Sequence, residues 1–68
     1  MGVVIIREMV GRSPSSWSEA AQNAVTTAAR TVRNIRRVDV VHQSARVEDG
    51  RIVEYHVELK IHFEYEGG

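Results

Sequence analysis

The chain has 68 residues, a formal net charge of zero and no cysteine. Its 43% apolar and 26% charged residues are typical of one small folded domain, which we take to span residues 1–68. Balanced charge argues against nucleic acid or a membrane surface as partner, and the lack of cysteine excludes disulfides and thiolate chemistry. With no visible signal peptide or membrane-spanning stretch, we expect a cytoplasmic protein.

The first predicted element is a strand over residues 3–10, which are rich in β-branched side chains. We expect Gly11 to end this strand. A turn over residues 12–16 follows and contains several serines and the only proline.

A helix is predicted after this turn and should run to about Arg33. Ser16 and Glu19 have the spacing of a capping box, while Ser13 with Pro14 is the alternative start. Most of the apolar stripe is alanine, so we expect the helix to lie close against a sheet. The stripe consists of Trp17, Ala20, Ala21, Ala24, Val25, Ala28 and Val32.

Two long strands are predicted next, over residues 36–47 and 52–65. The second of them alternates strictly between apolar and polar residues, which is typical of a strand with one buried face. Asp49-Gly50 between the strands is the usual sequence of a type I′ hairpin turn. The sequence therefore predicts an α+β fold in β-α-β-β order, with a three-stranded antiparallel sheet wrapped on one helix.

The two-residue turn also predicts the register of this hairpin. It places Val40 opposite Leu59 on the helix side, and it places Asp39 opposite Lys60 on the other face. His42 should face Val57, and Val38 should face Ile61, both on the helix side. Several apolar residues fall on the uncovered face, and both sheet edges are open, so we expect self-association. These residues are Val41, Ala45, Val47 and Ile52.

With these elements in place, the chain resembles the dodecin family. The resemblance rests on the order and spacing of G-R-S-P-S-S-W at 11–17, A-A-R-T-V-R-N-I at 28–35, E-D-G-R-I at 48–52 and E-Y-H-V-E-L-K-I-H-F at 54–63. It implies a hollow homododecamer that binds and stores flavins, namely FMN, riboflavin or FAD, without turning them over.

Two positions depart from the flavin-binding pattern of that family. Arg37 stands where those members carry a tryptophan that stacks on the flavin ring, and His56 stands where they carry a glutamine that bonds its edge. An arginine can stack its planar guanidinium, and a histidine can donate and accept. By the predicted register Arg37 and His56 share the uncovered face. Gln43 is the expected cross-strand neighbour of His56, and Asn34 is a further supporting polar group.

Other chemistry has weaker support. His56 and His62 lie about 20 Å apart on one strand, so one chain cannot chelate a metal with both. A site across a symmetry axis remains open, with calcium held by Glu48, Asp49 or the row Glu54, Glu58 and Glu64. No nucleophile has a base at recognisable spacing, so we expect no enzyme.

The basic cluster is interpreted as capping of the helix C-terminus and pairing with carboxylates of neighbouring subunits, in preference to a phosphate site. Trp17 is interpreted as a hydrophobic anchor under the first turn of the helix. The alternative to flavin storage is a dodecin-like shell without flavin that acts as an ion-binding or structural assembly. The basic cluster consists of Arg30, Arg33, Arg36 and Arg37.

Overall fold

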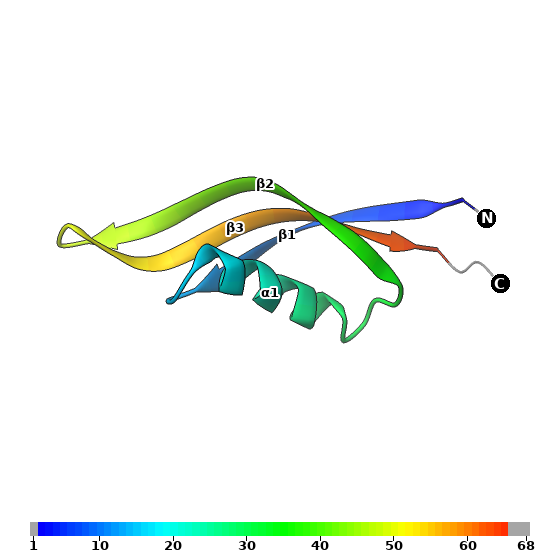
Figure 1. Cartoon of the computed structure of the whole chain (residues 1–68), viewed down its shortest axis with the longest axis horizontal. Coiled ribbons are helices and arrows are strands. Elements are labelled where there is room, and N and C mark those ends of the chain that lie inside the picture. Colours follow the sequence, from blue (N-terminus) through cyan, green and yellow to red (C-terminus); the bar gives the residue numbers. More distant parts are fainter. Residues whose placement is uncertain (1, 66–68) are drawn as a thin grey trace.

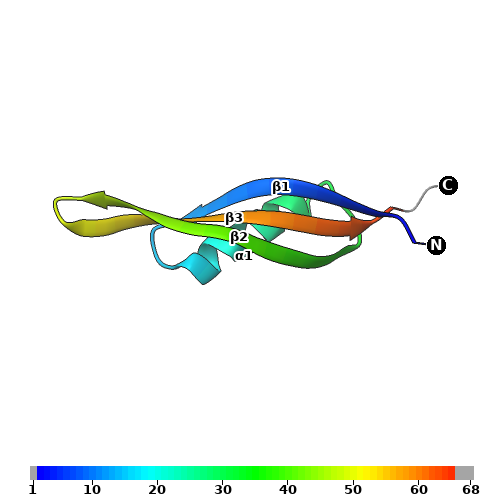
Figure 2. The same ribbon diagram turned by 90° about the horizontal axis from the view of Figure 1, so that it is seen from above.

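The structure is a computed structural model that describes residues 2–65. It contains strand β1 (Val4–Ser13), helix α1 (Trp17–Ala28), strand β2 (Ile35–Glu48) and strand β3 (Arg51–Glu64). The strands form one antiparallel sheet in the order β1-β3-β2, with β3 in the middle (Figure 2). The sheet curls around α1, which covers one of its faces (Figure 1). This arrangement confirms the predicted α+β fold.

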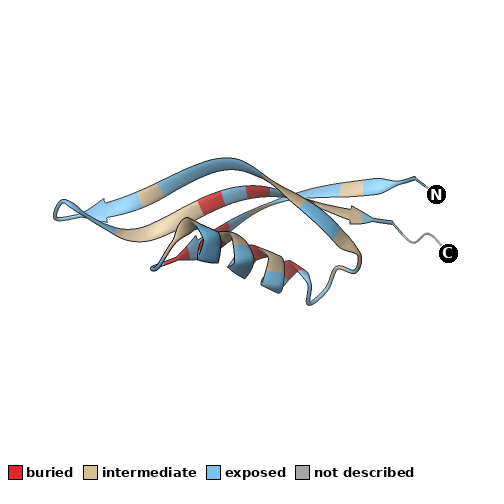
Figure 3. Ribbon diagram, viewed as in Figure 1, coloured by how far each residue is buried: buried red, intermediate tan, exposed pale blue. Residues whose placement is uncertain are grey.

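The core lies between α1 and the middle strand (Figure 3). Ala20, Ala24 and Ala28 repeat every four residues, so they form one face of the helix and are buried. Every second residue of β3 meets this face, as its alternating pattern predicts. The buried residues of β3 are Val57, Leu59 and Ile61. Burial of each of these side chains stabilises the fold by about 1.5–3 kcal/mol.

The helix starts as predicted but ends earlier. Ser16 is the N-cap, and its hydroxyl accepts the backbone N–H of Glu19 at 3.0 Å. The Glu19 carboxylate does not complete the capping box, because it accepts the Ser13 hydroxyl at 2.6 Å. α1 ends at Ala28, and the prediction of Arg33 was wrong. The β-branched residues at positions 31 and 32 favour helix poorly, so the chain turns there toward β2.

The first strand continues past Gly11, contrary to the expectation that this glycine ends it. β1 runs on to Ser13, and Gly11 pairs with Val57 at the centre of the sheet. The glycine is needed because α1 crosses directly above it. A Cβ built at Gly11 would overlap the carbonyl oxygen of Ala20 and lie 3.0 Å from the Ala24 methyl group. The close helix approach is therefore made by small residues on both elements.

The predicted hairpin turn is present. Asp49 and Gly50 have φ values of 52° and 73°, as a type I′ turn requires. Toward the other end of the strands, Val40 faces Leu59 and Asp39 faces Lys60, as predicted. Between these two regions the register shifts, and the prediction fails there.

A β-bulge at Val41 causes the shift. One extra residue on β2 moves every side chain after it to the opposite face until the hairpin end. His42 consequently faces Glu58 and not Val57, and it lies exposed on the uncovered face. Gln43 faces Val57 on the helix side, so its predicted pairing with His56 was wrong. The residue opposite His56 is Ser44.

The β2–β3 hairpin projects beyond the rest of the molecule (Figure 1). β1 pairs with β3 only from Tyr55 onward, so residues 51–54 have β2 as their sole neighbour among the described strands. The bulge also moves Ala45 to the helix side, where it faces Tyr55 and not Glu54, whereas Val47 faces Ile52 as predicted. Val41 stays on the uncovered face beside Val10. None of the helical segments in residues 2–65 is long and apolar enough to cross a membrane.

Candidate binding surface on the uncovered sheet face

The sheet face that points away from α1 carries most of the polar chemistry of the chain, and we call it the outer face. On β3 it is formed by alternate residues, as the sequence pattern predicts. β1 and β2 contribute the residues that pair with them. The outer-face residues of β3 are Glu54, His56, Glu58, Lys60, His62 and Glu64.

The first polar group on this face is built around Asp39. Its carboxylate accepts two hydrogen bonds from the Arg37 guanidinium, at 3.2 and 3.4 Å. The His62 ring nitrogen Nε2 lies 2.9 Å from the same carboxylate. Hydrogen bonds from Arg37 and then from His62 lower the pKa of Asp39 below its ordinary value. Arg37 is therefore held as one arm of an Arg–Asp–His group.

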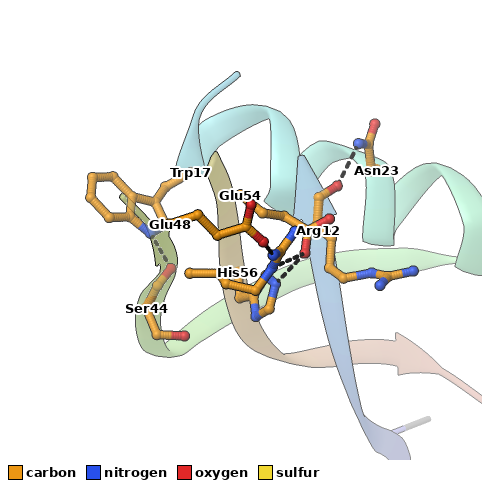
Figure 4. A network of polar contacts seen from close by, with 8 residues as sticks. Arg12, Trp17, Asn23, Ser44, Glu48, Glu54 and His56 are labelled. Atoms are coloured by element: carbon orange, nitrogen blue, oxygen red, sulfur yellow. Dashed lines mark hydrogen bonds and ion pairs between the residues drawn. The ribbon is translucent and has the colours of Figure 1, made fainter. Parts of the chain in front are cut away.

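A second group, which also joins an arginine and a histidine to a carboxylate, lies nearer the hairpin (Figure 4). His56 Nε2 lies 2.8 Å from the Glu54 carboxylate, and Arg46 Nε lies 3.7 Å from it. Arg46 also pairs with Glu48. The hydrogen bond from His56 is the main reason that the pKa of Glu54 is lowered. Both carboxylates are thus held ionised beside cationic or ionisable partners.

The structure does not bring the four predicted site residues together within one chain. Arg37 faces His62, which is six residues along β3 from His56, so Arg37 and His56 lie about 20 Å apart on the same outer face. Gln43 lies on the opposite face. Asn34 lies in the turn before β2 with a φ of 62°, and its carbonyl accepts the Glu64 N–H at 3.1 Å.

Trp17 joins the start of the helix to the hairpin. Its indole Nε1 donates to the Ser44 carbonyl at 2.9 Å (Figure 4). Its ring packs edge-on against Tyr55 with centroids 4.8 Å apart. The predicted role as an anchor under the first helical turn is confirmed. The hydrogen bond from Trp17 to the Ser44 carbonyl was not predicted, because the bulge at Val41 determines which β2 carbonyl lies below the indole ring.

An apolar groove on the helix side was also missed. α1 packs mainly on β1 and β3, so the helix-side face of β2 is left open. The resulting groove has a volume of about 370 Å³, and none of its lining residues is charged. Its position depends on where the helix crosses the sheet, which periodicity does not reveal. Its apolar lining includes Trp17, Ala21, Val25, Val38, Val40 and Val57.

The described residues do not form a metal centre within one chain. Among residues 2–65, no three histidine, aspartate or glutamate side chains converge on a point that a metal ion could occupy. The basic cluster does not cap α1, because the helix ends before it. Arg36 instead pairs with Glu64 at 3.1 Å, and Arg37 pairs with Asp39.

The lowered carboxylate pKa values predict a loss of stability in acid. The pKa values of Asp39 and Glu54 lie below the ordinary values of 3.8 and 4.5. As the pH falls, the unfolded chain therefore takes up protons at these groups before the folded protein does. Their contribution is fully present above about pH 4.5 and is lost as the pH falls through the lowered values. Urea midpoints measured between pH 6 and pH 3 should therefore fall on the acid side.

Asp39→Asn should flatten this acid dependence, because one of the titrating groups is removed. Asp49→Asn is the matched control, since asparagine also suits the left-handed backbone of the turn. Identical pH profiles for Asp39→Asn and the wild type would show that the Arg–Asp–His group does not contribute.

Together, these features define a class of small α+β proteins in which a curled antiparallel sheet wraps one helix and presents an ionised outer face. The Dodecin family model matches residues 3–66 of the chain. This protein belongs to the dodecin family.

Individual relatives agree with the family assignment. The calcium dodecin of Mycobacterium tuberculosis is 33% identical over 63 residues, which cover 93% of this chain and 89% of the relative. The dodecin structure from Streptomyces coelicolor superimposes with a TM-score of 0.93 at 33% identity, covering 97% of this chain and 94% of that chain. The M. tuberculosis calcium dodecin structure, described as calcium chelating, gives 0.83 at 33% identity over 96% and 93% of the two chains.

Proposed function

We propose that this protein is a non-catalytic small-ligand-binding protein that assembles as a homo-oligomeric shell, a dodecamer by family resemblance. One observation supports a site between copies more than any other. Arg37 and His56 share the outer face but lie about 20 Å apart, which is too far for one small ligand to contact both within a chain. Arg37 of one copy and His56 of another would have to meet across an interface.

A flavin is the first candidate ligand. The Arg37 guanidinium is planar and is held by Asp39, so it offers a fixed surface on which an aromatic ring can stack. His56 uses Nε2 toward Glu54, which leaves Nδ1 as the ring nitrogen for a ligand. Family membership supports the same class of ligand.

Titration of riboflavin and FMN with the assembled protein tests this assignment. Stacking on Arg37 should quench flavin fluorescence at micromolar protein, and Arg37→Ala should weaken the quenching. Gln43→Ala is the matched control, because Gln43 lies on the opposite face of the sheet. Flavin fluorescence that stays unchanged at micromolar protein would remove flavins from the proposal.

Binding of divalent cations is the second candidate. It is favoured by the ionised carboxylates of Asp39 and Glu54 and by the resemblance to a relative named calcium dodecin. Arginine and histidine already engage both carboxylates, so a cation would have to displace them. Calorimetric titration with calcium should then show binding that Asp39→Asn weakens. If the heat of calcium binding does not depend on either carboxylate, Asp39 and Glu54 are not the calcium ligands.

A further inference from the structure

His56 reaches the outer face with one ring nitrogen already engaged. Its Nε2 lies 2.8 Å from a carboxylate oxygen of Glu54, which stands two residues earlier on β3 and projects from the same face (Figure 4). The side chains of His56 and Glu54 are 31% and 26% exposed. The contact is therefore partly shielded from water, while part of the imidazole ring remains accessible.

The proton in this contact belongs to the histidine. The hydrogen bond from His56 lowers the pKa of Glu54, and the charges of Arg12 and Arg46 add to the effect, so the carboxylate is ionised at neutral pH. An ionised carboxylate can only accept hydrogen bonds. In the neutral imidazole, a proton on Nε2 leaves Nδ1 without one, so Nδ1 is a hydrogen-bond acceptor.

This acceptor is open to a ligand. Nδ1 has no hydrogen-bond partner among residues 2–65, and no buried side-chain nitrogen or oxygen in this part of the chain lacks a partner. Nδ1 must therefore reach the surface of the chain. Its cross-strand neighbours are Arg12 on β1 and Ser44 on β2.

We propose that Glu54 is a positioning residue that makes His56 an acceptor-only contact, so that the site selects planar ligands with an N–H donor on the ring edge. The inference rests on the proposed ligand site and names the chemistry that its ligand must present. A flavin meets this requirement through its imide N–H, whereas a ring edge with acceptors alone would leave Nδ1 unpaired. The glutamine that flavin-binding relatives carry at this position can both donate and accept, so it would not impose the same choice.

Paired titrations with riboflavin and its derivative methylated at the imide nitrogen test the selection. The wild type should bind the methylated ring about tenfold or more weakly, because Nδ1 is left without a donor. His56→Gln should reduce the difference, since the amide can turn to donate. Glu54→Ala should also reduce it, since the released ring can present its Nε2–H.

Glu58→Ala is the matched control for these variants. It removes an exposed carboxylate from the same face of β3, two residues beyond His56, where it faces His42. This variant should keep the full difference between the two flavins. If His56→Gln and Glu54→Ala discriminate as strongly as the wild type, the loss comes from the bulk of the methyl group and the proposal is overturned.

The protonation of the ring nitrogens tests the inference without any ligand. The chain has three histidines, so NMR of protein labelled only at histidine gives three sets of ring-nitrogen signals, and those of His56 are the ones missing in His56→Gln. At about pH 8, where an ordinary imidazole is neutral, Nε2 of His56 should carry the proton and Nδ1 should carry none. A proton on Nδ1 would overturn the inference even if flavin binds. If neither flavin binds, the flavin assignment fails, and the ring-nitrogen signals alone decide whether His56 is an acceptor-only contact.

Discussion

Arg37→Trp is expected to raise flavin affinity by about tenfold or more. The substitution replaces a guanidinium that is tied to Asp39 with a flat indole at the position where flavin-binding members of the family stack the ring. Stacking of a base on an aromatic side chain contributes about 1–3 kcal/mol, and 1.4 kcal/mol corresponds to tenfold in affinity. Riboflavin fluorescence titration of the variant and the wild type measures the gain.

Two controls separate stacking from other effects of this change. Arg36→Trp adds the same indole one residue away, at a bulge where the native arginine pairs with Glu64, and it should give no gain. Arg37→Ala removes the ion pair with Asp39 without adding an aromatic ring. A tryptophan variant that binds flavin no better than the wild type would show that Arg37 does not lie in the pocket.

Gly11→Ala is expected to destabilise the folded chain by about 1–3 kcal/mol, the usual cost of overpacking a core. The new methyl group would overlap the backbone carbonyl of Ala20, which cannot move aside as a flexible side chain can. The helix would have to shift away from the sheet, which would loosen the contacts of Leu59 and its neighbours. The urea midpoint should fall at fixed protein concentration, because assembly adds to the measured stability.

Gly2→Ala is the matched control for this substitution. A Cβ at Gly2 meets nothing within 4 Å, so the midpoint should stay within error of the wild type. If Gly11→Ala behaves in the same way as Gly2→Ala, the helix does not depend on its close approach to β1.

The fold was predictable because its signals are local. The alternation of β3 defined the buried face, the alanine stripe defined the helix face, and Asp49-Gly50 defined the hairpin turn. The helix end and the role of Gly11 were predicted wrongly, since both depend on the path of the chain across the sheet. A glycine in a predicted strand does not by itself show whether it ends the strand or makes room for a helix that packs on it.

The candidate site was predictable in part. Strand alternation placed Arg37 and His56 on one face, and the structure agrees. It could not reveal the bulge at Val41, because residues 42–46 of β2 contain only one apolar side chain, Ala45, and so show no alternation in which the change of face would appear. The bulge moved His42 outward and Gln43 inward, and it placed Ser44 beneath Trp17. The groove along β2 was missed for a similar reason, as it arises from the position of the helix.

Association of the chain is the central requirement for the proposed function, because Arg37 and His56 can share a ligand only across an interface. Native mass spectrometry of the protein as purified tests this point directly. We expect one dominant species whose mass is a multiple of the chain mass, twelvefold if the family resemblance holds for the assembly, together with any ligand that it carries. A stable single chain at micromolar concentration would contradict it.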